Sequence, residues 1–113
     1  YGKAAAELFS SLGVESLVSE RLVMGENIAQ AFQFAFSGNA DLGLVAYSQT
    51  ESPNLSGQGS VWLVPSELHQ PIKQDMVILI DSAAALEFSS FMKSAVVRDI
   101  LLTSGYLLPE ATP

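Results

Sequence analysis

The residues best suited to chemistry in this sequence lie where two helices are expected to begin, and the chemistry that they suit is anion binding. Residues 25–28 read Gly-Glu-Asn-Ile, in which the Asn27 side chain can accept a hydrogen bond from an N–H of the first helical turn. The unpaired N–H groups around Asn27 and Ile28 would then lie at the positive end of a helix dipole. Because most helix N-termini bind only water, this pattern by itself does not identify a ligand.

Two tyrosines are further candidates for ligand contacts, and each has a simpler interpretation. Tyr1 precedes an expected helix that starts at Gly2, so its N–H or hydroxyl could contact an anion there; alternatively, it is a frayed terminal residue. Tyr47 follows an expected strand, at the edge where open α/β sheets bind ligands; alternatively, it is a polar loop residue.

The composition favours binding over catalysis. The 113-residue chain has one histidine, His69, no cysteine and dispersed carboxylates, so it offers neither a Ser-His-Asp arrangement nor a cluster of metal ligands. A net charge of −7, with five scattered Lys and Arg residues, argues against a nucleic-acid partner. No apolar run approaches the roughly 20 residues that span a membrane. We therefore predict no enzymatic activity, no cofactor and no metal site.

Expected helices and short apolar strands would position the candidate residues. Helical spacing of apolar residues predicts a helix over 2–12 that ends at Gly13, and another from Ile28 to a stop at Gly38. Ser82 and Ser94 are expected caps of two more helices, over residues 83–92 and 95–103. Residues 49–60 are expected to form a surface loop. The expected strands cover residues 21–24, 42–46, 61–64 and 74–80. Strands between helices predict an α/β fold.

Four ordered blocks of the sequence resemble the molybdate-binding periplasmic proteins of bacterial ABC importers. The blocks are Tyr-Gly-Lys-Ala-Ala at residues 1–5, Gly-Glu-Asn-Ile-Ala-Gln-Ala at 25–31, Ala-Asp-Leu-Gly-Leu-Val-Ala at 40–46 and Ser-Val-Trp-Leu-Val-Pro at 60–65. The resemblance covers essentially the whole chain but only about the second half of a typical family member.

The resemblance implies a periplasmic binding fold of the second type, with a mixed sheet flanked by helices, here incomplete. Residues 1–68 would form most of the second lobe. Residues 72–113 would form a crossover strand and terminal helices that return to the first lobe. Because such a fragment would leave sheet edges unpaired, we expect it to need a partner, for example a second copy of itself.

The resemblance also implies a ligand set. Main-chain N–H groups at Tyr1 and Ile28 would contact molybdate or tungstate, with Asn27 beside them. Tyr47 is displaced by one position from a tyrosine that binds the ligand in some members. The remaining ligands of the family are small hydroxyl residues in the N-terminal half, which this sequence lacks. Because oxyanion oxygens without donors weaken binding, we predict weak or no oxyanion binding by this chain alone.

The expected function is capture of molybdate or tungstate between two lobes in the periplasm, followed by delivery to the membrane permease of an ABC importer. An alternative is an effector domain of a transcription regulator, or a binding protein for another anion such as sulfate. An enzyme on a related fold is the least favoured alternative, because the missing half would have to supply its catalytic groups.

Overall fold

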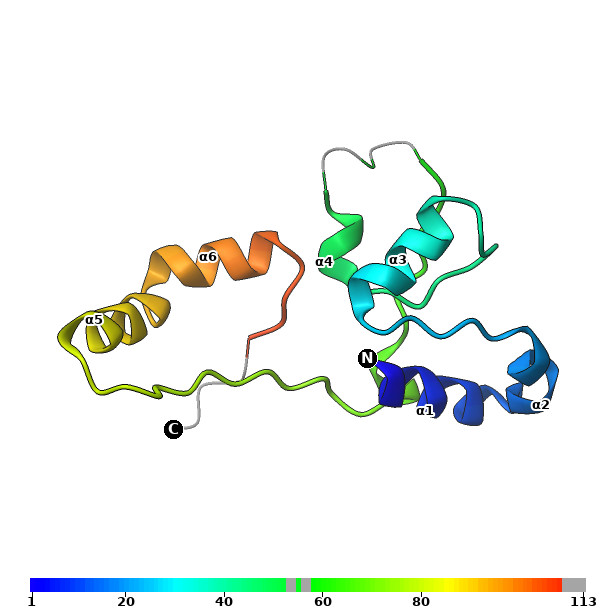
Figure 1. Cartoon of the computed structure of the whole chain (residues 1–113), viewed down its shortest axis with the longest axis horizontal. Helices are drawn as coiled ribbons and strands as arrows, with labels where there is room; N and C mark the ends of the chain where they lie inside the picture. Colours follow the sequence, from blue (N-terminus) through cyan, green and yellow to red (C-terminus); the bar gives the residue numbers. More distant parts are fainter. Residues whose placement is uncertain (53–54, 56–57, 109–113) are drawn as a thin grey trace. The chain divides into compact units, whose positions relative to one another are not determined.

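The structure is a computed structural model that describes residues 1–52, 55 and 58–108 (Figure 1). It divides into two compact units, Tyr1–Lys73 and Gln74–Pro113. Residues 109–113, the end of the segment predicted to return to a first lobe, lie outside the described residues.

The first unit begins with helix α1, Gly2–Leu12, as its apolar spacing predicts. Gly13 ends the helix in the left-handed conformation with φ 66°, which glycine adopts without a Cβ penalty. The chain continues with the short helix α2, Glu15–Val18, and the 3₁₀ turn η1, Ser19–Arg21. Helix α2 contacts both α1 and η1.

Helix α1 also holds the 3₁₀ turn η3, Ser66–Leu68, and the residues that follow it. The Ser11 hydroxyl donates to the Leu68 carbonyl at 3.0 Å, and the Gln70 N–H donates to a Glu7 carboxylate oxygen at 2.8 Å. The Lys3 ammonium lies 3.7 Å from the other Glu7 oxygen. Hydrogen bonds between residues about sixty positions apart thus join the two ends of the first unit.

Helix α3, Ile28–Phe36, ends where the sequence predicts, with Gly38 at φ 74° just beyond it. The chain then reverses, and residues 42–46 run back along the helix. This return brings Gly43 so close to α3 that a Cβ on it would lie 2.8 Å from the Ala35 Cβ. Only a residue without a side chain allows this approach.

The second unit contains helices α5, Ala83–Met92, and α6, Ala95–Thr103, which pack against each other. Both helices have the predicted bounds. The hydroxyls of Ser82 and Ser94 accept hydrogen bonds from N–H groups of the first turns, at 3.2 and 3.4 Å, which confirms the predicted caps.

The predicted α/β fold with a mixed sheet is wrong for the described part of the chain, which contains helices and no strand. Arg21 belongs to η1, and the other segments predicted as strands, residues 42–46, 61–64 and 74–80, have no ladder partners. Apolar runs indicate which segments favour a strand, but a strand also needs a neighbour to accept its backbone hydrogen bonds. None of these segments finds one within the described residues.

Without a sheet, few side chains of the described residues are buried. Among the described residues only Leu8, Ala46 and Val97 are buried apolar side chains. Much of the sequence that was expected inside a sheet is exposed, with Leu42 at 75% and Leu79 at 88%, although residues 43–45 are half-buried and Ala46 is buried. None of the described helices is long and apolar enough to cross a membrane.

Replacing Gly43 by Ala should destabilise the first unit by about 1–3 kcal/mol, because the new methyl group would overlap Ala35. Urea denaturation followed by far-ultraviolet circular dichroism measures this loss. Gly2→Ala is the matched control, since a Cβ at Gly2 meets nothing within 4 Å and helix α1 favours alanine. Equal stability of the Gly43 variant and the parent would show that the return segment does not pack on α3.

Candidate functional site

The start of α3 is the best-organised polar site of the described chain. Asn27 is its N-cap in an extended conformation, and the Asn27 Oδ1 accepts the Gln30 N–H at 2.9 Å, which confirms the predicted cap. In return, the Gln30 Oε1 accepts the Glu26 N–H at 2.6 Å. Two donors at this helix end are therefore satisfied by side chains, in a variant of the capping box.

A close backbone contact fixes the direction in which the chain enters α3. A Cβ on Gly25 would lie 2.8 Å from the Ala31 nitrogen and 3.0 Å from the Asn27 carbonyl oxygen. The loop before the helix therefore folds back over the first turn, where only glycine fits.

Two adjacent donors remain available at this helix end. The Ala31 N–H makes the first helical hydrogen bond, to the Asn27 carbonyl at 3.1 Å. The Ile28 and Ala29 N–H groups precede it, and no described residue accepts a hydrogen bond from either. Unpaired N–H groups at the positive end of a nine-residue helix favour an anion.

A short helix, α4, Tyr47–Thr50, lies next to this site. The sequence predicted Tyr47 after a strand and residues 49–60 in a loop, so α4 was not expected. The available signal was Gln49, because a Gln at the third helical position often accepts the N–H of the residue before the helix. The Gln49 Oε1 does accept the Ala46 N–H, at 3.0 Å.

The Gln49 side chain also reaches α3. Its Nε2 donates to the Ile28 carbonyl oxygen at 3.3 Å, across 21 residues of sequence. The starts of α3 and α4 are thus connected through one partly buried amide.

The Tyr47 hydroxyl interacts with Glu51. Its hydrogen bond to the Glu51 carboxylate, together with the negative charge of Glu51, raises the pKa of Tyr47. Tyr47 is 40% exposed, so solvent reaches this pair. A ligand contact by the hydroxyl would have to compete with Glu51.

Tyr1 is the N-cap of α1, and its carbonyl accepts the Ala5 N–H at 2.9 Å. Its side chain does not cap the helix and is 41% exposed. The main packing partners of α1 are α2 and η3. That Tyr1 and Ile28 contact one ligand together stays a prediction.

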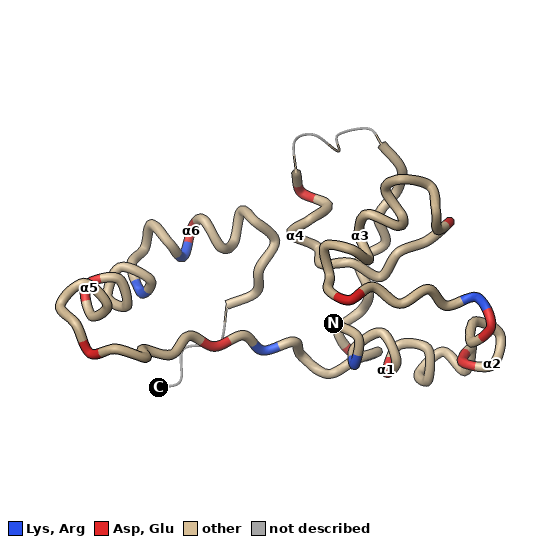
Figure 2. The backbone as a smooth tube through the Cα atoms, viewed as in Figure 1, with Lys and Arg blue, Asp and Glu red and all other residues tan. Residues whose placement is uncertain are grey.

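The surroundings of the α3 site carry no basic side chain from the same part of the sequence. Lys and Arg are absent between Arg21 and Lys73, whereas Glu26 directly precedes Asn27 (Figure 2). In the described residues, no three His, Cys, Asp or Glu side chains cluster so that they could hold a metal ion. The start of α3 itself offers an anion neutral N–H donors and a helix dipole.

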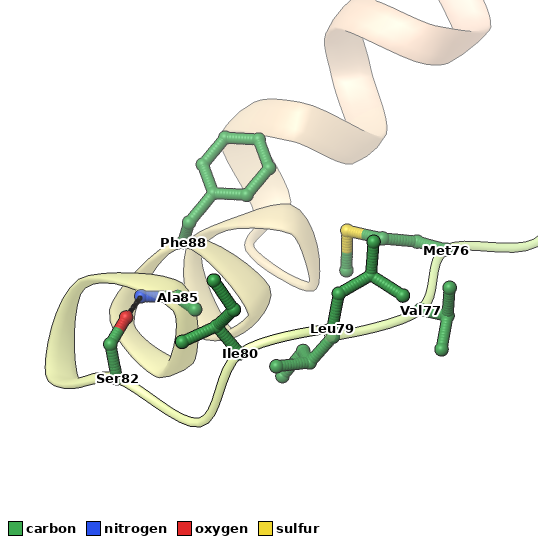
Figure 3. Close-up of a pocket in the computed structure, with 8 residues that line it drawn as sticks. Met76, Val77, Leu79, Ile80, Ser82, Ala85 and Phe88 are labelled. Carbon is green, nitrogen blue, oxygen red and sulfur yellow. Dashed lines mark hydrogen bonds between the residues drawn. The ribbon is translucent and has the colours of Figure 1, made fainter.

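The second unit contains an apolar groove with different chemistry (Figure 3). Residues 76–80 form one wall, and Ala85 and Phe88 of α5 form the other. Ser82 is the polar side chain in the lining, and its hydroxyl is already bonded to the Ala85 N–H. The groove is therefore poorly suited to an oxyanion.

Comparison with known proteins gives one family and two informative relatives. The family described as "Bacterial extracellular solute-binding protein" matches residues 1–107. The "Molybdate-binding protein ModA" of Rhodobacter capsulatus is 42% identical over 110 residues, which are 95% of this chain and 42% of that protein. The protein of the same name from Azotobacter vinelandii is 39% identical over 109 residues, 94% of this chain and 43% of that protein. The chain thus spans less than half the length of these relatives.

Replacing Asn27 by Ala should cost about 1 kcal/mol at the start of α3, because the Gln30 N–H loses its acceptor. Hydrogen exchange of the Gln30 amide, followed by NMR, should become several-fold faster. Asn27→Ser is the control, since its hydroxyl can cap the same N–H and should preserve protection. Unchanged exchange in the alanine variant would contradict the observed cap.

Replacing Glu51 by Gln should lower the pKa of Tyr47 toward its ordinary value, because the charge that opposes tyrosinate formation is removed. The raised pKa stabilises the folded chain below the ordinary pKa of tyrosine, and this contribution is lost as the pH rises through the raised value. NMR titration of the Tyr47 ring measures the shift. Glu67→Gln is the control and should leave that titration unchanged.

Proposed function

The chain belongs to the family of bacterial extracellular solute-binding proteins, and from this premise we propose that it contributes to a binding site for molybdate or tungstate. The proposal draws on two relatives that are named for molybdate binding. The observation that carries it is the pair of unpaired N–H groups, of Ile28 and Ala29, at the start of α3. A solute-binding role involves recognition and release and requires no catalytic group.

Neutral donors suit a ligand that must be released. The helix dipole and N–H groups offset the charge of a tetrahedral oxyanion without a permanent cation beside it. Each N–H donates to one oxygen, so an anion with four oxygens needs donors from several segments. Asn27 sets the direction of the donors through its cap, and the Ile28 N–H is the central contact of the proposed site.

We propose that Tyr1 and Tyr47 make secondary contacts with the ligand. The main-chain N–H of Tyr1 would be a second contact from the start of α1. The Tyr47 hydroxyl would contribute only after leaving Glu51, whose hydrogen bond competes with the ligand. Because the chain spans 42% and 43% of its relatives' lengths, we propose weak binding by this chain alone.

The wider role that we propose is transport. The oxyanion would be captured in the periplasm and passed to a membrane permease of an ABC importer, with residues 1–68 and 72–113 contributing to different lobes of the binding protein. The sparse burial and the exposed apolar segments favour association of this chain with a second copy. Sedimentation of a dilute sample as a monomer alone would contradict that association.

The function is tested by titrating the chain with molybdate, tungstate, sulfate and phosphate while recording amide NMR spectra, which detect weak binding. We expect molybdate and tungstate to shift the Ile28 and Ala29 amide signals in a saturable manner. A preference for sulfate or phosphate, or no response of these amides to any oxyanion, would overturn the proposal.

Replacing Ile28 by Pro should weaken molybdate binding about tenfold to a hundredfold, because one hydrogen bond to a charged ligand is lost. Proline is tolerated at the first helical position, and the extended conformation of Asn27, with φ −154° and ψ 170°, suits a residue before proline. Ile28→Ala retains the N–H and is the control. Equal affinities of the proline and alanine variants would exclude the Ile28 N–H as a donor.

A further inference from the structure

We infer that Gln49 is a positioning residue of the proposed oxyanion site. Its side chain holds the peptide unit between Ile28 and Ala29 and thereby orients the Ala29 N–H, which donates to the ligand. This inference rests on the proposed function for its ligand. It concerns a residue that lies outside the expected binding set and 21 positions from Ile28.

The Gln49 side-chain amide makes two hydrogen bonds. Its oxygen accepts the Ala46 N–H at 3.0 Å, and its nitrogen donates to the Ile28 carbonyl at 3.3 Å, both in partly buried surroundings. One planar amide therefore joins the end of the return segment to the first turn of α3. With both ends bonded, the side chain is held in one arrangement.

The choice of acceptor makes this link relevant to the ligand. The Ile28 carbonyl belongs to the same peptide unit as the Ala29 N–H, so a donor on the carbonyl fixes that peptide plane and polarises its N–H. Hydrogen bonds in series strengthen one another by roughly 10–30% per bond. The chain of bonds runs from the Ala46 N–H through the Gln49 amide to the peptide that carries the Ala29 donor.

The other polar groups around this turn are committed elsewhere. Asn27 caps the Gln30 N–H, and the Gln30 side chain accepts the Glu26 N–H. Gln49 therefore supports the peptide whose N–H has no acceptor among the described residues. The buried Ala46 side chain, at 7% exposure, keeps the other end of the link in place.

Three variants of the full chain test the inference by amide NMR with molybdate as the probe. Gln49→Met keeps the length and removes both hydrogen bonds. Gln49→Glu keeps the shape but places a carboxylate against the Ile28 carbonyl. Gln33→Met is the matched control, because Gln33 is an exposed residue of α3.

We expect Gln49→Met to weaken molybdate binding about tenfold, which corresponds to the loss of one hydrogen bond from the Ala29 N–H to the ligand. Gln49→Glu should weaken binding further. The control should bind as the parent does. In ligand-free spectra the Ala29 amide proton should move upfield in both Gln49 variants, while the Gln30 amide, capped by Asn27, should stay in place. A role in packing alone would reverse the order, since glutamate is the closer match to glutamine in shape.

The binding measurements distinguish a failure of the proposed role of Gln49 from a failure of the proposed molybdate binding. If the parent and both Gln49 variants bind molybdate equally, the inference is overturned and the proposed function stands. If the parent shows no response to molybdate, the proposed function fails, and an unmoved Ala29 signal in the variants would overturn the structural part of the inference as well.

Discussion

The constraint on which the rest of this structure depends is that each main-chain N–H and carbonyl needs a hydrogen-bond partner. Helices meet this need locally, so α1, α3, α5 and α6 form with well-placed caps even though few side chains are buried around them. Extended segments meet it only through a neighbouring chain segment. Residues 76–80 are all apolar, yet they form no strand in the described part of the chain and remain exposed.

The same constraint generates the candidate site. A helix cannot satisfy its own first N–H groups, and here the side chains of Asn27 and Gln30 satisfy the Gln30 and Glu26 N–H groups only. The donors left over, on Ile28 and Ala29, are adjacent and lie on a turn that Gly25 and Gln49 hold in place. The anion affinity that we propose for this position would arise from incomplete capping of the helix start, in a stretch of sequence, residues 22–72, that contains no Lys or Arg.

Two glycines and one amide account for the local order around α3. Gly25 lets the incoming loop lie against α3, and Gly43 lets the outgoing segment do the same. Gln49 then joins that outgoing segment to the helix start. These contacts are backbone approaches and hydrogen bonds, which explains how the region around α3 is organised although Ala46 is the only buried residue of the described range 22–52.

Four of the helices and their ends follow from the sequence alone, because their signals are local: apolar spacing in α1, the serine caps of α5 and α6, and the Asn27 cap of α3. The other features depend on contacts between distant parts of the chain. The predicted strands failed because a strand depends on a distant partner that local residues cannot specify. Gln49 was missed because its bond to Ile28 spans 21 residues, and Tyr47 was assigned without knowledge that Glu51 would engage its hydroxyl.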